Sequence, residues 1–333
     1  MNSSDTINKT VLHNHMLEIS SILSSEKFLA CIIASMTVMY CLTLVVNGSV
    51  LTTVLGSDYL IWQPQVRLLA NLLLCDLILT TTLVLSSIYH LINRRIVTFG
   101  TACIASCFVI SVCIFSAIGT LAFMAVDRYC YICHAIHYFR IFTPRKLKTG
   151  LVCTWLVPFS MITIYVILLA MHEPQQETVY GIVCDPDILE EFVGFPKDLA
   201  LFRKSWSTLA FFFCIGVFLY CYYKMYIEAK NAVEPFQTSN KKARKRIFFY
   251  GTMFSLQLVP YWIKMLIDLL WDYHLASHEA FALLTHIVVP VLMTIPPCIN
   301  PIIYGYRSQE VRRRIPGINL HRIQPVMNAA WNG

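Results

Sequence analysis

Three side chains of types that bind metals lie close together near the middle of the chain. Cys133, His134 and His137 offer ligands that zinc accepts, but the neighbouring sequence supplies no fourth one. No serine–histidine–aspartate set, pair of carboxylates or glycine-rich phosphate loop stands out elsewhere. We therefore predict that the protein is not an enzyme and that it holds no metal and no cofactor.

Asp76, Asn47 and Asn300 are polar residues that interrupt long apolar stretches. Such residues are costly inside a membrane, and they usually face the interior of a helix bundle, where they find polar partners. Pro301 removes a backbone hydrogen bond from its helix, and the neighbouring asparagine can satisfy the freed carbonyl. The three residues predict a central polar network, which either only fixes helix register or acts as a switch between two packings.

Two acid–base pairs are further candidates. Asp127 and Arg128 are adjacent, precede Tyr129, and act either as charges that reach the membrane surface or as part of a switch. Lys264 and Asp268 are spaced so that they share one face of a helix. Either they pair with each other, or Lys264 binds the carboxylate of a ligand.

The composition identifies the environment in which these residues act. Of the 333 residues, 57% are hydrophobic and 14% are charged, whereas soluble domains carry about 25% charged residues. This excludes an ordinary soluble enzyme and argues against a nucleic-acid-binding domain, although the net charge is +7. Continuous apolar runs of this kind form helices and not a barrel. We predict an all-α bundle of seven transmembrane helices, at 28–57, 68–93, 99–126, 149–172, 205–223, 247–270 and 280–306.

The basic residues predict the orientation of this bundle. With the N-terminus outside, eighteen lysines and arginines fall on the cytoplasmic side and seven on the outer side, and basic loops favour the cytoplasm. The expected regions are an extracellular tail at 1–27, the bundle at 28–306, and a cytoplasmic segment at 307–333. We therefore expect a multi-pass protein of the plasma membrane whose C-terminus is cytoplasmic.

The outer side carries two further predictions. Cys103 and Cys184 are the cysteines that this topology places in an oxidising compartment, and we expect them to form a disulfide; the alternative is two free thiols. Asn2 and Asn8 begin glycosylation sequons in the outer tail.

These residues, in this order, resemble the rhodopsin-like G-protein-coupled receptors over about residues 28–316. The matching elements are Asn47, the stretch 72–77, Cys103, the stretch 124–129, Trp155, Cys184, Pro260 and the stretch 300–304. A finer likeness, at 124–133 and 296–304, points to the vertebrate odorant-receptor branch, of the fish type. The chain departs from that branch at Ala135, where a proline is usual.

The resemblance implies a mechanism. Asp127 would restrain Arg128 at rest, and an outward swing of the inner end of span six would release that arginine to a heterotrimeric G protein. Ile136 matches the apolar residue that relatives insert into the G protein. Asn300, Pro301 and Tyr304 would belong to the switch, and 307–315 would form a short amphipathic cytoplasmic helix.

The resemblance also places a pocket for a small extracellular ligand between spans three, five, six and seven. Its expected lining is Ile110, Ser111, Ile114, Phe115, Tyr261, Lys264, Asp268 and His286. An isoleucine stands at Ile110, where amine receptors carry an aspartate, which argues against a biogenic amine. His286 is either a structural hydrogen-bonding group or a ligand contact.

Two other functions remain open at this stage. The first is a non-olfactory receptor of the same family for a peptide or lipid. The second is a channel or transporter, although we see no inverted repeat, broken short span or ring of charges. The oligomeric state is left open.

Overall fold

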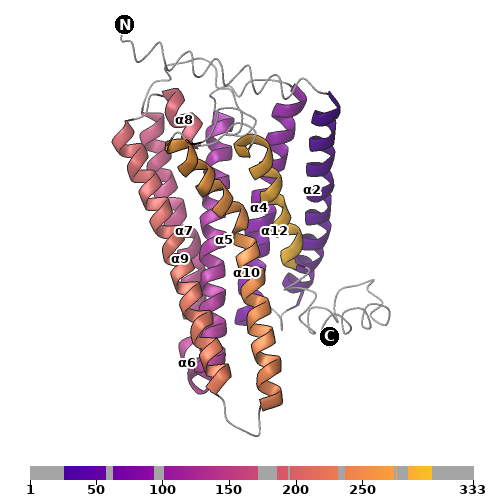
Figure 1. Ribbon diagram of the computed structural model, residues 1–333, viewed down its shortest axis with the longest axis vertical. Coiled ribbons are helices and arrows are strands. Elements are labelled where there is room, and N and C mark those ends of the chain that lie inside the picture. The colour runs from indigo at the N-terminus through magenta and orange to yellow at the C-terminus, as the bar shows by residue number, and fades with distance from the viewer. Residues whose placement is uncertain are drawn as a thin grey trace.

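The computed structural model describes residues 26–57, 63–93, 101–171, 186–193, 196–231, 237–273, 275 and 284–301. Within these ranges the chain is built of helices and short turns, without strands (Figure 1). The long helices are α2 (Glu26–Leu55), α4 (Pro64–Asn93), α5 (Thr101–Cys133), α7 (Pro144–Ala170), α9 (Lys197–Asn231) and α10 (Gln237–Asp272). The shorter ones are η1 (Ala135–His137), α6 (Tyr138–Ile141), α8 (Pro186–Val193), the π-helical turn η2 (Leu284–Val288) and α12 (Val289–Asn300).

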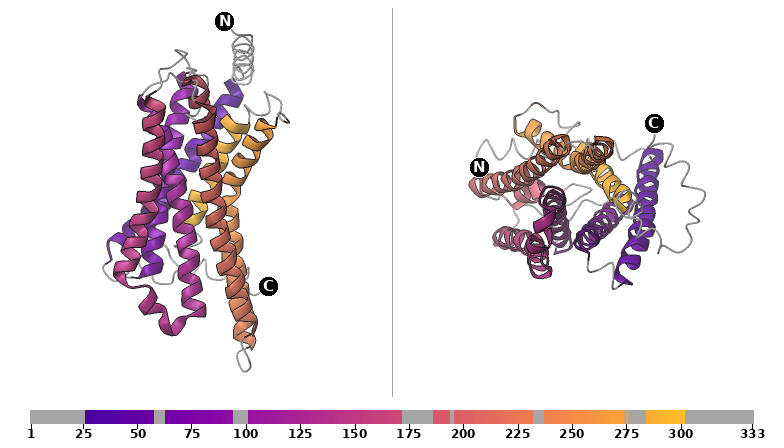
Figure 2. Two further views of the ribbon diagram at one scale, coloured as in Figure 1. Left: turned by 90° about the vertical axis from the view of Figure 1, so that its left-hand side faces the viewer. Right: turned by 90° about the horizontal axis from the view of Figure 1, so that it is seen from below.

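The long helices form one closed bundle. Helix α5 packs against α4, α7 and α9, while α10 joins α9 to α12, and α12 closes the bundle against α2. The end-on view in Figure 2 shows α12 beside α2. Helix α8 lies at one end of the bundle and α6 at the other (Figure 1).

The outer surface of the bundle is apolar, unlike that of a soluble protein, and a few polar residues are buried inside it. Large apolar side chains such as Val45, Leu156 and Phe213 are more than half exposed on its outside, whereas Asp76 and Asn300 are buried. This distribution is expected when lipid surrounds the helices, because lipid accepts apolar side chains and gives polar ones no hydrogen bonds.

The predicted fold is confirmed. Helices α2, α4, α5, α7 and α9 are long and apolar enough to cross a membrane. Helix α10 and the shorter apolar α12 occupy the positions of spans six and seven. The tail at 1–25 and the segment 302–333 lie outside the described residues, and with them Asn2, Asn8, Tyr304 and the expected cytoplasmic helix.

Two helices extend well beyond their predicted spans. Helix α9 has 35 residues, which corresponds to about 52 Å of helix against about 30 Å of hydrocarbon. Helix α10 begins at Gln237, so the basic stretch 241–246 is helical. The length of an apolar run corresponds only to the part of a helix inside the hydrocarbon. Spans predicted from such runs therefore leave out charged helical turns at either end.

Local sequence explains where α7 begins. Thr143 lies just before the helix, and its Oγ1 accepts a hydrogen bond from the backbone N–H of Lys146 at 3.4 Å. Pro144 follows in the first turn, where its missing N–H leaves no bond unmade. This cap ends the loop between α5 and α7, which includes α6, and sets the position at which the chain re-enters the bundle.

Candidate functional site

A cavity of about 500 Å³ opens between α5, α9, α10 and the segment formed by η2 and α12. Seven of the eight side chains predicted to form a pocket line it: Ile110, Ser111, Ile114, Phe115, Tyr261, Lys264 and Asp268. The eighth, His286, lies in η2, but its side chain is outside the described residues. The structure therefore brings these seven side chains together around one cavity.

One wall of the cavity is apolar. Ile118 and Phe211 line it and belong to the main buried cluster between α5, α9 and α10. Met265 lines it from α10 and Met293 from α12. An occupant would bury apolar surface against these side chains, as is usual in small-molecule sites.

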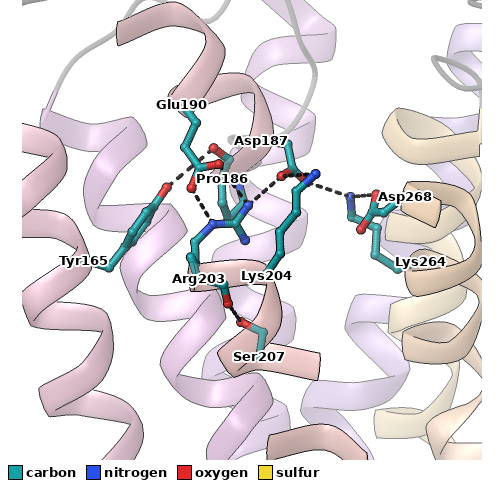
Figure 3. A network of polar contacts seen from close by, with 9 residues as sticks. All are labelled: Tyr165, Pro186, Asp187, Glu190, Arg203, Lys204, Ser207, Lys264 and Asp268. Atoms are coloured by element: carbon teal, nitrogen blue, oxygen red, sulfur yellow. Dashed lines mark hydrogen bonds and ion pairs between the residues drawn. The ribbon is translucent and has the colours of Figure 1, made fainter. Parts of the chain in front are cut away.

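The cavity also has a charged end that the sequence reasoning missed. Arg203 Nη2 lies 2.5 Å from Asp187 Oδ1, and Lys204 Nζ lies 3.5 Å from the same oxygen (Figure 3). Lys264 Nζ donates to Asp268 Oδ1 at 2.6 Å and lies 3.8 Å from Asp187 Oδ2. Of the two interpretations of Lys264, the pair with Asp268 is therefore formed in this structure.

The short helix α8 brings the acidic groups to this end. Glu190 accepts hydrogen bonds from Nε and Nη2 of Arg203, the second at 3.1 Å. Leu189, 1% exposed, packs in a cluster with Cys103 and Tyr165. Cys103 is disulfide-bonded. The pairing with Cys184 stays a prediction, because Cys184 lies outside the described residues.

The sequence contains a helical spacing that indicates part of the charged end of the cavity. Arg203, Ser207 and Phe211 are spaced four residues apart, and all three line the cavity from α9. Arg203 and Lys204 lie just before the apolar run at 205–223, and so outside the span that this run predicts. The acidic groups of α8 have no comparable signal, since their partners lie on another helix.

The buried centre of the bundle contains Asp76, Asn47 and Asn300, but the side-chain amide of Asn47 donates to a different group from that of Asn300. Asn300 Nδ2 donates to Asp76 Oδ2 at 2.5 Å. Asn47 Nδ2 instead donates to the carbonyl oxygen of Pro297 at 2.8 Å. That carbonyl is the one that Pro301, four residues further on, leaves without a helical partner. The asparagine that satisfies the proline kink therefore comes from α2 and not from the kinked helix.

A second polar link joins α4, α5 and α7. Trp155 Nε1 donates to Asn71 Oδ1 at 2.8 Å, and Asn71 Nδ2 donates to Thr120 Oγ1 at 2.7 Å. The Thr120 hydroxyl in turn donates a hydrogen bond to the backbone carbonyl oxygen of Ser116 at 2.7 Å. Asn71 was not among the predicted residues, although its partner Trp155 belonged to the family resemblance.

The C-terminal end of α5 carries Asp127 and Arg128, the predicted acid–base pair. Asp127 is buried and accepts a hydrogen bond from the hydroxyl of Tyr138 at 2.7 Å. Burial, and then this hydrogen bond, raise the pKa of Tyr138 well above its usual range. Arg128 and Tyr129 are half-buried, and the Tyr129 hydroxyl lies 3.2 Å from His134 Nε2.

The loop between α5 and α7 presents apolar side chains to its surroundings. Ile136 is 94% exposed and Phe139 is 82% exposed, on η1 and α6 respectively. Exposed apolar groups close together at the end of a bundle are typical of a surface that binds another protein.

Comparison with known proteins agrees with this architecture. Residues 46–304 match the family described as 7 transmembrane receptor (rhodopsin family). Olfactory receptor 4F6 from Homo sapiens is 25% identical over 86% of this chain and 88% of its own length. Olfactory receptor 7E178 from Mus musculus is 26% identical over 90% of this chain and 87% of its own length. The G-protein coupled receptor homolog Q2/3L from Sheeppox virus is 25% identical over 80% of this chain and 68% of its own length.

The family match covers most of the chain, including α4, α5, α7, α9, α10 and α12. The similarity to the two olfactory receptors covers similar shares of this chain and of each relative. The protein therefore belongs to the rhodopsin family of seven-transmembrane receptors, which are multi-pass signalling receptors of the plasma membrane and not enzymes.

Proposed function

We propose that this receptor binds a small, partly apolar extracellular ligand, an odorant, in the cavity between α5, α9, α10 and α12. Ligand binding then activates a heterotrimeric G protein through outward movement of the inner end of α10. The observation that carries the proposal is the cavity of about 500 Å³. Its lining comes from several helices, and activation would require these helices to move relative to one another. The names of the relatives support the odorant ligand.

Helix α10 connects the cavity to the inner end. It carries Tyr261, Lys264 and Asp268 at the cavity and the basic stretch 241–246 near its start. Pro260 lies inside the helix between them, where it removes one backbone hydrogen bond. A contact with ligand on one side of this weak point can therefore change the position of the other side.

The G-protein surface would lie around α6. Ile136 and Phe139 supply exposed apolar contacts there. Arg128 would be released from Asp127 on activation, and Asn300, Pro301 and Tyr304 would rearrange with it. The hydrogen bond from Tyr138 to Asp127 adds a restraint from the inner loop to the resting state.

The membrane orientation is part of the same proposal. The N-terminus would be extracellular, with glycans at Asn2 and Asn8, and residues 28–306 would form the bundle. Residues 307–333 would be cytoplasmic and begin with an amphipathic helix. The excess of basic residues in the inner loops supports this arrangement.

The test expresses the full chain at the cell surface and measures activation of purified G proteins in isolated membranes, with and without a panel of odorants. Activation that depends on receptor and odorant is the expected result. Ligand-gated current from the purified receptor in liposomes without G protein would instead identify a channel.

A non-olfactory receptor is the second candidate, and it is favoured by the similarity to the viral receptor homolog. Transcript location separates the two. Expression in scattered single neurons of the olfactory epithelium is expected for an odorant receptor. Expression in brain, gut or gonad without that pattern would point to an internal peptide or lipid ligand.

A further inference from the structure

Three basic side chains from two helices meet around one carboxylate at the charged end of the cavity. Arg203 and Lys204 reach Asp187 from α9, at 2.5 Å and 3.5 Å, and Lys264 reaches it from α10 at 3.8 Å (Figure 3). The carboxylate belongs to α8, which is not one of the long helices of the bundle. An anionic group from outside the bundle wall therefore occupies the point where the three positive charges converge.

The structure would tolerate replacement of this carboxylate by another anion. Arg203 is also held by Glu190 through two nitrogens, and Lys264 is held by Asp268 at 2.6 Å. If the side chain of Asp187 rotated away, both cations would keep a carboxylate partner. A second anion at the same point would restore the contacts that Asp187 now makes.

Helix α8 itself is anchored independently of Asp187. Leu189 is buried, and the side chain of Glu190 is 7% exposed. The side chain of Asp187 is 26% exposed by comparison. Its carboxylate can therefore turn toward solvent by a rotamer change while α8 keeps its position.

The apolar part of the cavity determines which chemical groups the rest of a bound ligand would carry. Ile114, Phe211, Met265 and Met293 line it with apolar and aromatic groups. A molecule that spans the cavity would place an anionic head at the basic side chains and an apolar tail against these residues. A cationic head would have to displace one of the basic side chains that already pair with the three carboxylates at this end.

We propose that the charged end of the cavity is a carboxylate-binding subsite in which Asp187 holds the place of the ligand's carboxylate. The ligands of the receptor are then small acids with an apolar tail, and they compete with Asp187 for Lys204, Lys264 and Arg203. This inference rests on the proposed function as a receptor for a small extracellular ligand.

The test measures the thermal stability of the purified full-length receptor in lipid nanodiscs, which needs no G protein. The probes are straight-chain carboxylates from hexanoate to dodecanoate, with primary alcohols and amines of the same chain lengths for comparison. Carboxylates should raise the midpoint of unfolding in a saturable manner. Alcohols should act only at much higher concentration, and amines should have no effect.

Single variants then test the competition. Asp187→Asn removes the internal anion, and it should lower the half-saturating carboxylate concentration by roughly fivefold, as expected for one partly exposed ion pair. Lys204→Gln and Lys264→Gln should each raise it by at least a similar factor. Lys197→Gln is the matched control, because Lys197 is exposed at the first position of α9.

Three results would overturn the inference: equal response to alcohols and carboxylates, no response to any carboxylate, or an Asp187→Asn variant with unchanged or weaker carboxylate binding. If that variant fails to reach the cell surface, Lys204→Gln decides, and unchanged binding there contradicts the inference. Carboxylate binding without G-protein activation would contradict the proposed function alone. Odorant-dependent activation without carboxylate binding would contradict this inference alone.

Discussion

The side-chain amide of Asn300 donates a hydrogen bond to the carboxyl group of Asp76 at 2.5 Å, which ties α12 to α4 in the buried centre of the receptor. Asp76 is 3% exposed and Asn300 is 4% exposed. The bond therefore links two helices that lie far apart in the sequence. Any movement of α12 relative to α4 must break it or carry Asp76 along.

Removing the amide should destabilise the receptor. Asn300→Ala leaves the buried Asp76 carboxyl without this donor, and we expect a loss of about 1–3 kcal/mol, the cost of leaving a buried polar group without its partner. The midpoint of thermal unfolding in nanodiscs measures it. In a double-mutant cycle with Asp76→Ala, the second change should add little once the first is made. Additive losses would show that the two side chains act independently; Ser160→Ala, on the exposed face of α7, is the control.

Weakening the restraint at the inner end should raise signalling without ligand. Asp127→Asn should increase basal G-protein activation severalfold, because it removes the charge that we propose restrains Arg128. Tyr138→Phe should raise it less, since it removes only the hydroxyl that donates to Asp127. Basal activation per receptor at the cell surface is the measurement.

The control for this pair is Tyr131→Phe. Tyr131 packs edge-on against the ring of Tyr138 and is 54% exposed. Unchanged or lower basal activation in Asp127→Asn, with normal surface expression, would remove Asp127 from the resting restraint.

Truncating the exposed apolar side chains of the inner loop should weaken coupling but leave the fold intact. Ile136→Ala and Phe139→Ala remove side chains that are 94% and 82% exposed, so they take little from the packing of the bundle. G-protein activation at saturating ligand should fall severalfold, while the unfolding temperature stays constant. Met171→Ala, 75% exposed just beyond α7, is the matched control and should couple normally. Full coupling in both inner-loop variants would place the G-protein contact elsewhere.

Two helical glycines should respond in opposite directions to the same change. A methyl group at Gly150 would lie 2.5 Å from Cε1 of Phe123, so α5 and α7 would have to separate or the ring would have to move. At Gly48 nothing lies within 4 Å of the added carbon. Gly48→Ala should therefore raise stability by up to about 1 kcal/mol, the helix-propensity gain, and Gly150→Ala should lower it. Equal shifts in unfolding temperature for the two variants would mean that the Phe123 ring moves aside at little cost in stability.

The sequence alone was sufficient for the fold. Apolar runs identified the spans, because hydrocarbon thickness and peptide hydrogen bonding act on local composition. Helical spacing placed Lys264 and Asp268 on one face, and the two are paired at 2.6 Å. The resemblance placed Ile110 and Ile114 at the cavity, which they line.

Contacts between separate elements were decided by the tertiary structure. Asp187 reaches Arg203, Lys204 and Lys264 only because α8 packs against α5, α7 and α9 at this end of the bundle. Asn47 satisfies the carbonyl of Pro297 because α2 and α12 are neighbours. Local patterns determine which face of a helix is apolar, but the rotation and neighbours of each helix depend on the packing of all of them at once. Partners across helices therefore follow from that packing, and not from the spacing of residues within one segment.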